Sequence, residues 1–177
     1  MNNYPIHITA KISEEKLQKE LFIFMMRASR TPPHLGVIVN GKLYDISTVG
    51  PNIALPINEV YKTIVKRKTE VIFFSLKRPS FNKEKTEEII SQKVKKHRKV
   101  TKECSCLLPV KEFVSKVYGL ELSNANFIFE LLPILYQNDL IKEVSQVNLN
   151  NKIAANTFYL TKYTKLDVEN CINAINR

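Results

Sequence analysis

The sequence predicts an α+β fold in which an antiparallel sheet packs against helices, in a single domain covering residues 1–177. Residues 35–39 and 42–47 flank an Asn-Gly pair in the pattern of a β-hairpin, and residues 71–76 form a short apolar run typical of a buried strand. Other segments carry helical signals, but strands and helices do not alternate regularly as they do in βαβ proteins. A chain of 177 residues can bury a core without metals or disulfides.

The first predicted elements are a short helix and a hydrophobic segment. Residues 13–19 predict a helix with Ser13 as its N-cap and with Glu14 and Glu15 in the first turn, where carboxylates interact favourably with the helix dipole. Residues 20–28 are apolar and rich in Phe and Met. They either continue this helix or form a buried strand, and periodicity does not decide between the two.

The hairpin is the clearest local signal. Asn40-Gly41 is the favoured pair for a two-residue type I′ turn, because both positions tolerate positive φ. Counting back from this turn places His34 opposite Ser47 and diagonal to Asp45, with all three side chains on one face. An imidazole beside a carboxylate or hydroxyl can be held in the tautomer and orientation that a general base requires.

The rest of the chain carries five helical patterns and two strand patterns. The helices are expected over residues 56–68, from Ser80 or Asn82 to about 99, over 106–118 with Gly119 ending the helix, over 124–136 with Pro133 kinking or stopping it, and over 166–176; the strands are expected over 71–76 and 157–162.

Cys106 begins one of these predicted helices. Apolar residues recur at helical spacing from it, so Cys106 starts the face that packs on the sheet; they are Val110, Phe113, Val114 and Val117. A thiol at a helix start is favoured as thiolate by the dipole and the free backbone N–H groups, which can also hold an oxyanion. Cys104 is the competing nucleophile, but a helix starting there would place Pro109 beyond the tolerated first turn.

Residues 33–44 resemble the His-bearing hairpin of the circularly permuted NlpC/P60 family of papain-like cysteine hydrolases. In that family the His precedes the Cys along the chain, and the Cys opens a helix, as His34 and Cys106 do here. The resemblance implies a papain-like fold with Cys106 as nucleophile, His34 as general base, and Asp45 or Ser47 as the polar third residue. It also implies hydrolysis of an amide or ester bond, or acyl transfer, on a peptide, lipid or other acyl substrate.

A second hypothesis rests on charge. Residues 62–102 contain 14 Lys or Arg against four Glu, while the other residues carry 13 of each sign, so this segment accounts for the net charge of +10. Such a segment can attract nucleic acid or lipid headgroups, so the chain could be a catalytically inactive papain-like module that binds an anionic partner. Lys outnumbers Arg 21 to 6, which instead favours a solvated face, because bidentate phosphate recognition uses Arg.

Several classes of function are disfavoured. Three cysteines, two of them only two residues apart, do not form a disulfide framework and indicate a reducing, cytoplasmic environment. The first ten residues lack a signal-peptide pattern, and the longest apolar run, residues 21–26, is too short to span a bilayer. Cys104, Cys106 and His97 lack the spacing and the fourth ligand of a metal site, and no glycine-rich phosphate loop is present, so no metal or cofactor is expected. The oligomeric state is left open.

Overall fold

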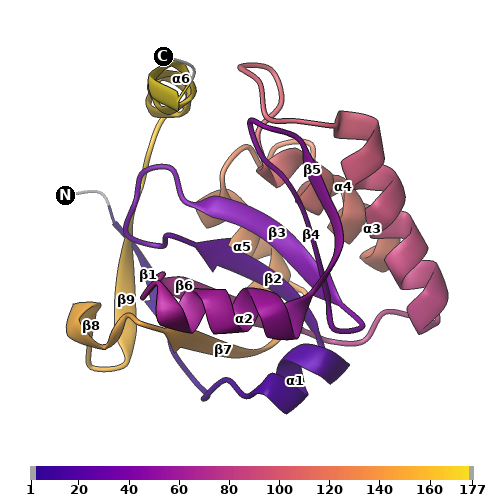
Figure 1. The fold of residues 1–177 in the computed structure, drawn as a ribbon, viewed down its shortest axis with the longest axis horizontal. Helices are drawn as coiled ribbons and strands as arrows, with labels where there is room; N and C mark the ends of the chain where they lie inside the picture. The colour runs from indigo at the N-terminus through magenta and orange to yellow at the C-terminus, as the bar shows by residue number, and fades with distance from the viewer. Residues whose placement is uncertain (1–2, 176–177) are drawn as a thin grey trace.

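The computed structural model describes residues 3–175. It has an α+β fold with antiparallel sheets packed against helices, as the sequence predicts (Figure 1). In chain order the elements are β1 (Asn3–His7), α1 (Glu14–Lys19), β2 (Leu21–Met26), β3 (His34–Val39), β4 (Lys42–Ile46), β5 (Pro51–Pro56), α2 (Ile57–Lys66), β6 (Val71–Leu76), α3 (Lys83–His97), α4 (Leu107–Tyr118), α5 (Ile128–Gln137), β7 (Ile141–Val147), the short 3-10 helix η1 (Asn150–Lys152), β8 (Ile153–Ala154), β9 (Thr157–Thr161) and α6 (Lys165–Ile175).

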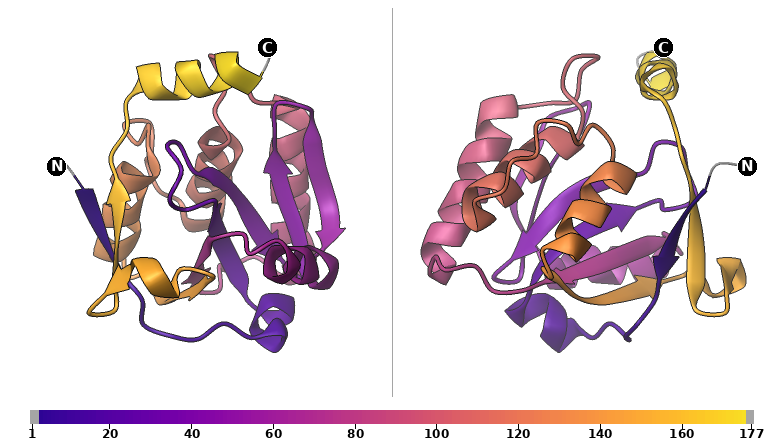
Figure 2. Two further views of the ribbon diagram at one scale, coloured as in Figure 1. Left: turned by 60° about the vertical axis from the view of Figure 1, so that its left-hand side comes forward. Right: turned by 180° about the vertical axis from the view of Figure 1, so that it is seen from behind.

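The main sheet has six strands in the order β5-β4-β3-β2-β6-β7, and all its neighbouring strands are antiparallel. Helices α1 and α2 cover one face, and α3, α4 and α5 cover the other (Figures 1 and 2). A smaller sheet in the order β1-β9-β8 packs against the larger core through Ile6, Phe158 and Leu160. Over the described residues, none of the helices combines the length and hydrophobicity needed to cross a bilayer.

Strand β2 resolves the ambiguity of residues 20–28. Its side chains alternate between two cores: Ile23 and Met25 enter the larger one, whereas Phe22 and Phe24 enter the smaller one under α1 and α2. Because both faces of this central strand are covered, every position is apolar and the period-two alternation disappears from the sequence.

The β3–β4 hairpin forms as predicted. Val39 pairs with Lys42 across the turn, and the pairing continues back to Gly36 opposite Asp45. The two turn residues have positive φ, 53° at Asn40 and 71° at Gly41, as a type I′ turn requires. The hairpin therefore fixes which side chains of β3 and β4 share a face.

Helix α4 also follows the sequence pattern. Cys106 is its N-cap, and Pro109 lies in the first turn, where its missing N–H leaves no intrahelical hydrogen bond unmade. Gly119 ends the helix in the left-handed conformation, with φ of 68°. Val110, Phe113, Val114 and Val117 are all buried, so this stripe anchors the helix and with it the position of Cys106.

Some boundaries differ from the prediction. Asn82, not Ser80, caps α3 by accepting a hydrogen bond from the Lys85 amide at 2.8 Å. Helix α5 starts late because the Glu130 carboxylate accepts hydrogen bonds from the amides just before it, and it continues past Pro133 to Gln137. Strands β1, β5, β7 and β8 were not predicted, and position 176 of the last predicted helix lies outside the described residues.

Candidate active site

His34 is the first residue of β3, and its ring contacts the carboxylate predicted to lie diagonally from it. Nε2 of His34 is 3.0 Å from Oδ2 of Asp45, a residue only 4% exposed. The other carboxylate oxygen, Oδ1, accepts a hydrogen bond from Nδ2 of Asn52 on β5 at 2.8 Å. Side chains from three neighbouring strands thus fix the orientation of the imidazole.

The sulfur of Cys106 affects the pKa of the same ring. Burial by itself lowers the pKa of His34, but the hydrogen bond to Asp45 and the interactions with the Cys106 sulfur outweigh it and raise the pKa to about 10. The ring is therefore an imidazolium at neutral pH. A cationic imidazole beside a sulfur favours the thiolate, the nucleophilic form of cysteine.

His34 and Cys106 line one cavity of about 480 Å³. This volume lies in the range of small-molecule sites. The end of β2, the start of β3 and residues of α6 line the cavity. Figure 2 (left) shows α6 lying above the sheet. The walls of the cavity are mostly apolar and come from several segments far apart in the chain; they include Pro32, Pro33, Leu107, Phe127, Tyr163, Val168, Ile172 and Ile175.

Tyr163 is a buried side chain of this wall that carries a hydroxyl. It is 7% exposed, and its ring stands edge-on to Phe127 and Phe129, each with centroids 5.3 Å away. Burial is the largest cause that raises the pKa of its phenol, so the hydroxyl stays protonated. No sequence pattern predicts Tyr163 as a site residue, because it follows β9 and reaches Cys106 only through tertiary packing.

Ser47, the other predicted third residue, lies on the cavity wall but its hydroxyl serves a turn. Its Oγ donates to the carbonyl of Gly50 at 3.0 Å and accepts from the amides of Val49 and Gly50 at 3.2 and 3.3 Å. Asp45, not Ser47, is therefore the residue that hydrogen-bonds to the His34 ring.

The two candidate thiols, Cys104 and Cys106, have different surroundings in the structure. Cys104 is half-buried against the larger core and lies outside the cavity, whereas Cys106 lies on the cavity wall. Burial, reinforced by the Glu112 carboxylate, raises the pKa of Cys104 and keeps it protonated. The third cysteine, Cys171, lines the cavity from α6, and all three cysteines are free thiols.

The basic residues 62–102 come from elements on both faces of the main sheet. Helix α2 packs on one face of the main sheet and α3 on the other, so the charge of the segment is divided between two sides of the molecule. Ion pairs also neutralise part of it: Glu112 contacts Lys93 and Lys96 at 3.5 and 3.0 Å. Among the described residues, no cluster of three His, Cys, Asp or Glu side chains could hold a metal ion.

Comparison with known proteins gives no match: no family model, no curated protein and no solved structure matches this chain. Its function is therefore inferred from its own residues.

Proposed function

We propose that this protein is a papain-like cysteine hydrolase or acyltransferase of the permuted NlpC/P60 type, acting on an amide or ester bond. The observation that carries the proposal is the His34 ring, which contacts the Asp45 carboxylate and interacts with the Cys106 sulfur at the wall of a cavity of about 480 Å³. The order of His before Cys, the hairpin that bears the His and the helix that starts at the Cys support the same family.

The chemistry follows from these groups. The Cys106 thiolate attacks the carbonyl carbon of the substrate, and the oxygen becomes an oxyanion near the backbone N–H groups at the start of α4. The His34 imidazolium gives its proton to the departing amine or alkoxide, which leaves an acyl thioester on Cys106. Water then attacks the thioester while His34 accepts its proton, releasing the acid and the free enzyme. An alcohol or amine in place of water gives acyl transfer.

The cavity wall favours an apolar acyl group. Most of the lining side chains are aliphatic or aromatic, and the aromatic rings of Phe127 and Tyr163 lie on the same wall as Cys106. Burying apolar substrate surface there contributes about 25 cal/mol per Å² to binding. A lipid or a peptide with a hydrophobic residue at the scissile bond suits this wall better than a highly charged substrate does.

Thiol reactivity tests the proposal directly. We expect iodoacetamide at neutral pH to alkylate Cys106 at a rate at least about tenfold higher than Cys104, as mapped by peptide mass spectrometry. Cys106 should also react faster than a free thiol such as glutathione. His34→Gln should slow the alkylation of Cys106 without slowing that of Cys104. His7→Gln is the matched control, because His7 lies on β1 and bonds to Thr157 instead.

Two results would contradict the proposal. One is a Cys106 that reacts no faster than glutathione. The other is a rate at Cys106 that His34→Gln leaves unchanged while circular dichroism shows the variant folded.

A further inference from the structure

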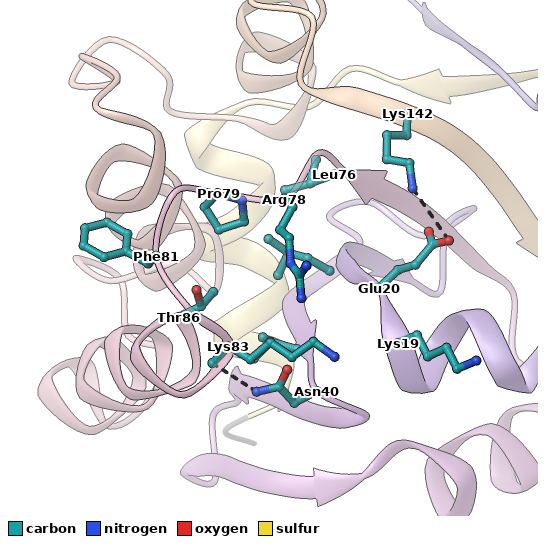
Figure 3. A pocket seen from close by; sticks show the side chains of 12 residues that line it. Lys19, Glu20, Asn40, Leu76, Arg78, Pro79, Phe81, Lys83, Thr86 and Lys142 are labelled. Atoms are coloured by element: carbon teal, nitrogen blue, oxygen red, sulfur yellow. Dashed lines mark hydrogen bonds and ion pairs between the residues drawn. The ribbon is translucent and has the colours of Figure 1, made fainter.

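A second cavity, of about 190 Å³, lies at the opposite end of the sheet from the Cys–His site (Figure 3). Strand β3 runs from His34 to Val39, and these two residues line different cavities, so the two sites are separated by the length of the strand. The second cavity is bounded by the α1–β2 junction, the hairpin turn, the β6–α3 connection and β7; its lining residues include Lys19, Glu20, Asn40, Arg78, Lys83 and Lys142.

The charge around this cavity is unbalanced. Lys142 lies 3.7 Å from Glu20, the single carboxylate of the lining, and Lys19 pairs with Glu15 at 2.6 Å. Within residues 3–175, neither Arg78 nor Lys83 has a carboxylate within 4.0 Å. Figure 3 shows their charged groups pointing into the same space. Both side chains are exposed, so solvent screens their mutual repulsion, and a bound anion would interact favourably with both.

The position of Lys83 is structurally fixed. Nδ2 of Asn40, in the hairpin turn, donates to the backbone carbonyl of Lys83 at 3.0 Å and to Glu87 at 2.9 Å. This contact ties the first residue of α3 to the sheet. The side-chain Nδ2 of Asn40 already donates to these two groups. Contacts to a ligand therefore come chiefly from Arg78 and Lys83.

The base of the cavity is apolar. Leu21, Val39 and Leu76, on three neighbouring strands, are each at most 7% exposed, and Phe81 closes one side. A recess with a cationic rim over an apolar base suits an anion that carries an apolar group. A guanidinium binds phosphate oxygens bidentately, and a lysine adds a second positive charge.

We propose that this cavity binds a phosphomonoester attached to an apolar group, with Arg78 as the bidentate partner and Lys83 as the second cation. The phosphate can belong to a soluble organic phosphate or to a lipid headgroup, and both sources present the same chemistry to these two residues. The inference does not depend on the hydrolase proposal, because none of the residues that carry it lies at the Cys–His cavity.

Calorimetric titration with phenyl phosphate tests the site. We expect saturable binding that Arg78→Ala weakens about tenfold and Lys83→Ala weakens less, as expected for loss of charge-assisted hydrogen bonds. Arg67→Ala is the matched control: it removes the same charge from an exposed position at the end of α2 and should change affinity less than about twofold. Circular dichroism checks that each variant is folded.

A parallel sedimentation assay assigns the source of the phosphate. Binding to vesicles that contain phosphatidic acid, lost in Arg78→Ala, indicates a lipid headgroup; phenyl phosphate binding without vesicle binding indicates a soluble ligand. The proposal is overturned if phenyl phosphate does not bind, or if Arg78→Ala and Arg67→Ala weaken its binding equally.

Discussion

Nε2 of His34 and Oδ2 of Asp45 lie 3.0 Å apart, although eleven positions separate the two residues in the chain. The hairpin makes this contact possible, because its type I′ turn sets the register that brings β3 and β4 side by side. The contact also gives the ring a charged partner. Much of the chemistry proposed here depends on this pair.

Asp45→Asn tests the charge of that partner. The amide keeps the shape of the side chain but removes the negative charge that favours the imidazolium. We therefore expect the rate at which iodoacetamide alkylates Cys106 to fall by about tenfold or more. Because Asp45 is buried, the free energy of unfolding should also fall, by about 1–3 kcal/mol in urea titration. Asn52→Ala is the control: it removes the other hydrogen bond of Asp45 and should slow alkylation less. Equal rates in Asp45→Asn and the wild type would exclude an electrostatic role.

The protonation of His34 can be followed by NMR. Its ring signals should titrate with a midpoint near 10, far above the ordinary pKa of 6.5. The sign for stability follows from linkage: the charged ring stabilises the fold fully below about pH 6.5, the pKa in the unfolded chain, and this contribution is lost as pH rises towards 10. Urea titrations across this range should show the wild type losing its stability advantage over His34→Gln. A midpoint near 6.5 would show that Asp45 and Cys106 do not raise the pKa of His34 beyond the effect of burial.

Gly36 lies in β3, two residues from His34, and leaves no room for a side chain. A Cβ built there would be 2.4 Å from Cζ of Phe24 and 2.6 Å from the carbonyl oxygen of Tyr44. We expect Gly36→Ala to lower the free energy of unfolding by about 1–3 kcal/mol and to slow alkylation of Cys106, because the strand that positions the imidazole must shift. Gly50→Ala is the matched control, since its Cβ would meet nothing within 4 Å. Similar losses in both variants would argue against the steric account.

The basic segment supports a different prediction. Its charge is divided between α2 and α3 on opposite faces of the sheet, so we expect few simultaneous contacts with a nucleic acid backbone. Binding to single-stranded RNA should therefore be weak, with a shallow dependence of log affinity on log salt concentration, as measured by fluorescence anisotropy. A steep salt dependence would instead favour the inactive binding module suggested by the charge of residues 62–102.

The parts of the site that could be predicted are those encoded locally. The Asn40-Gly41 turn fixes the hairpin register, and the apolar stripe that follows Cys106 fixes the start of α4, so nearby residues suffice to place each half. The cavity wall could not be predicted, because Tyr163 and α6 reach it through contacts with segments far away in the chain. Strand β5 was not predicted for a different reason. It begins and ends with proline, which an edge strand tolerates but which weakens the sequence pattern of a strand.

Tyr163→Phe separates transition-state stabilisation from thiol reactivity. The substitution keeps the ring that packs edge-on against Phe127 and Phe129 and removes only the hydroxyl of a residue that lines the cavity. If this hydroxyl donates to the oxyanion, hydrolysis of a p-nitrophenyl ester should slow by about 100-fold, the usual effect of losing one such donor.

Alkylation by iodoacetamide proceeds without an oxyanion, so its rate at Cys106 should not change in Tyr163→Phe. Cys106→Ala sets the background for ester hydrolysis, because it removes the proposed nucleophile while leaving Tyr163 in place. A parallel fall in both rates would indicate that Tyr163 acts on the thiol or on the shape of the cavity. Unchanged hydrolysis would place the oxyanion donors elsewhere, at the backbone N–H groups that begin α4.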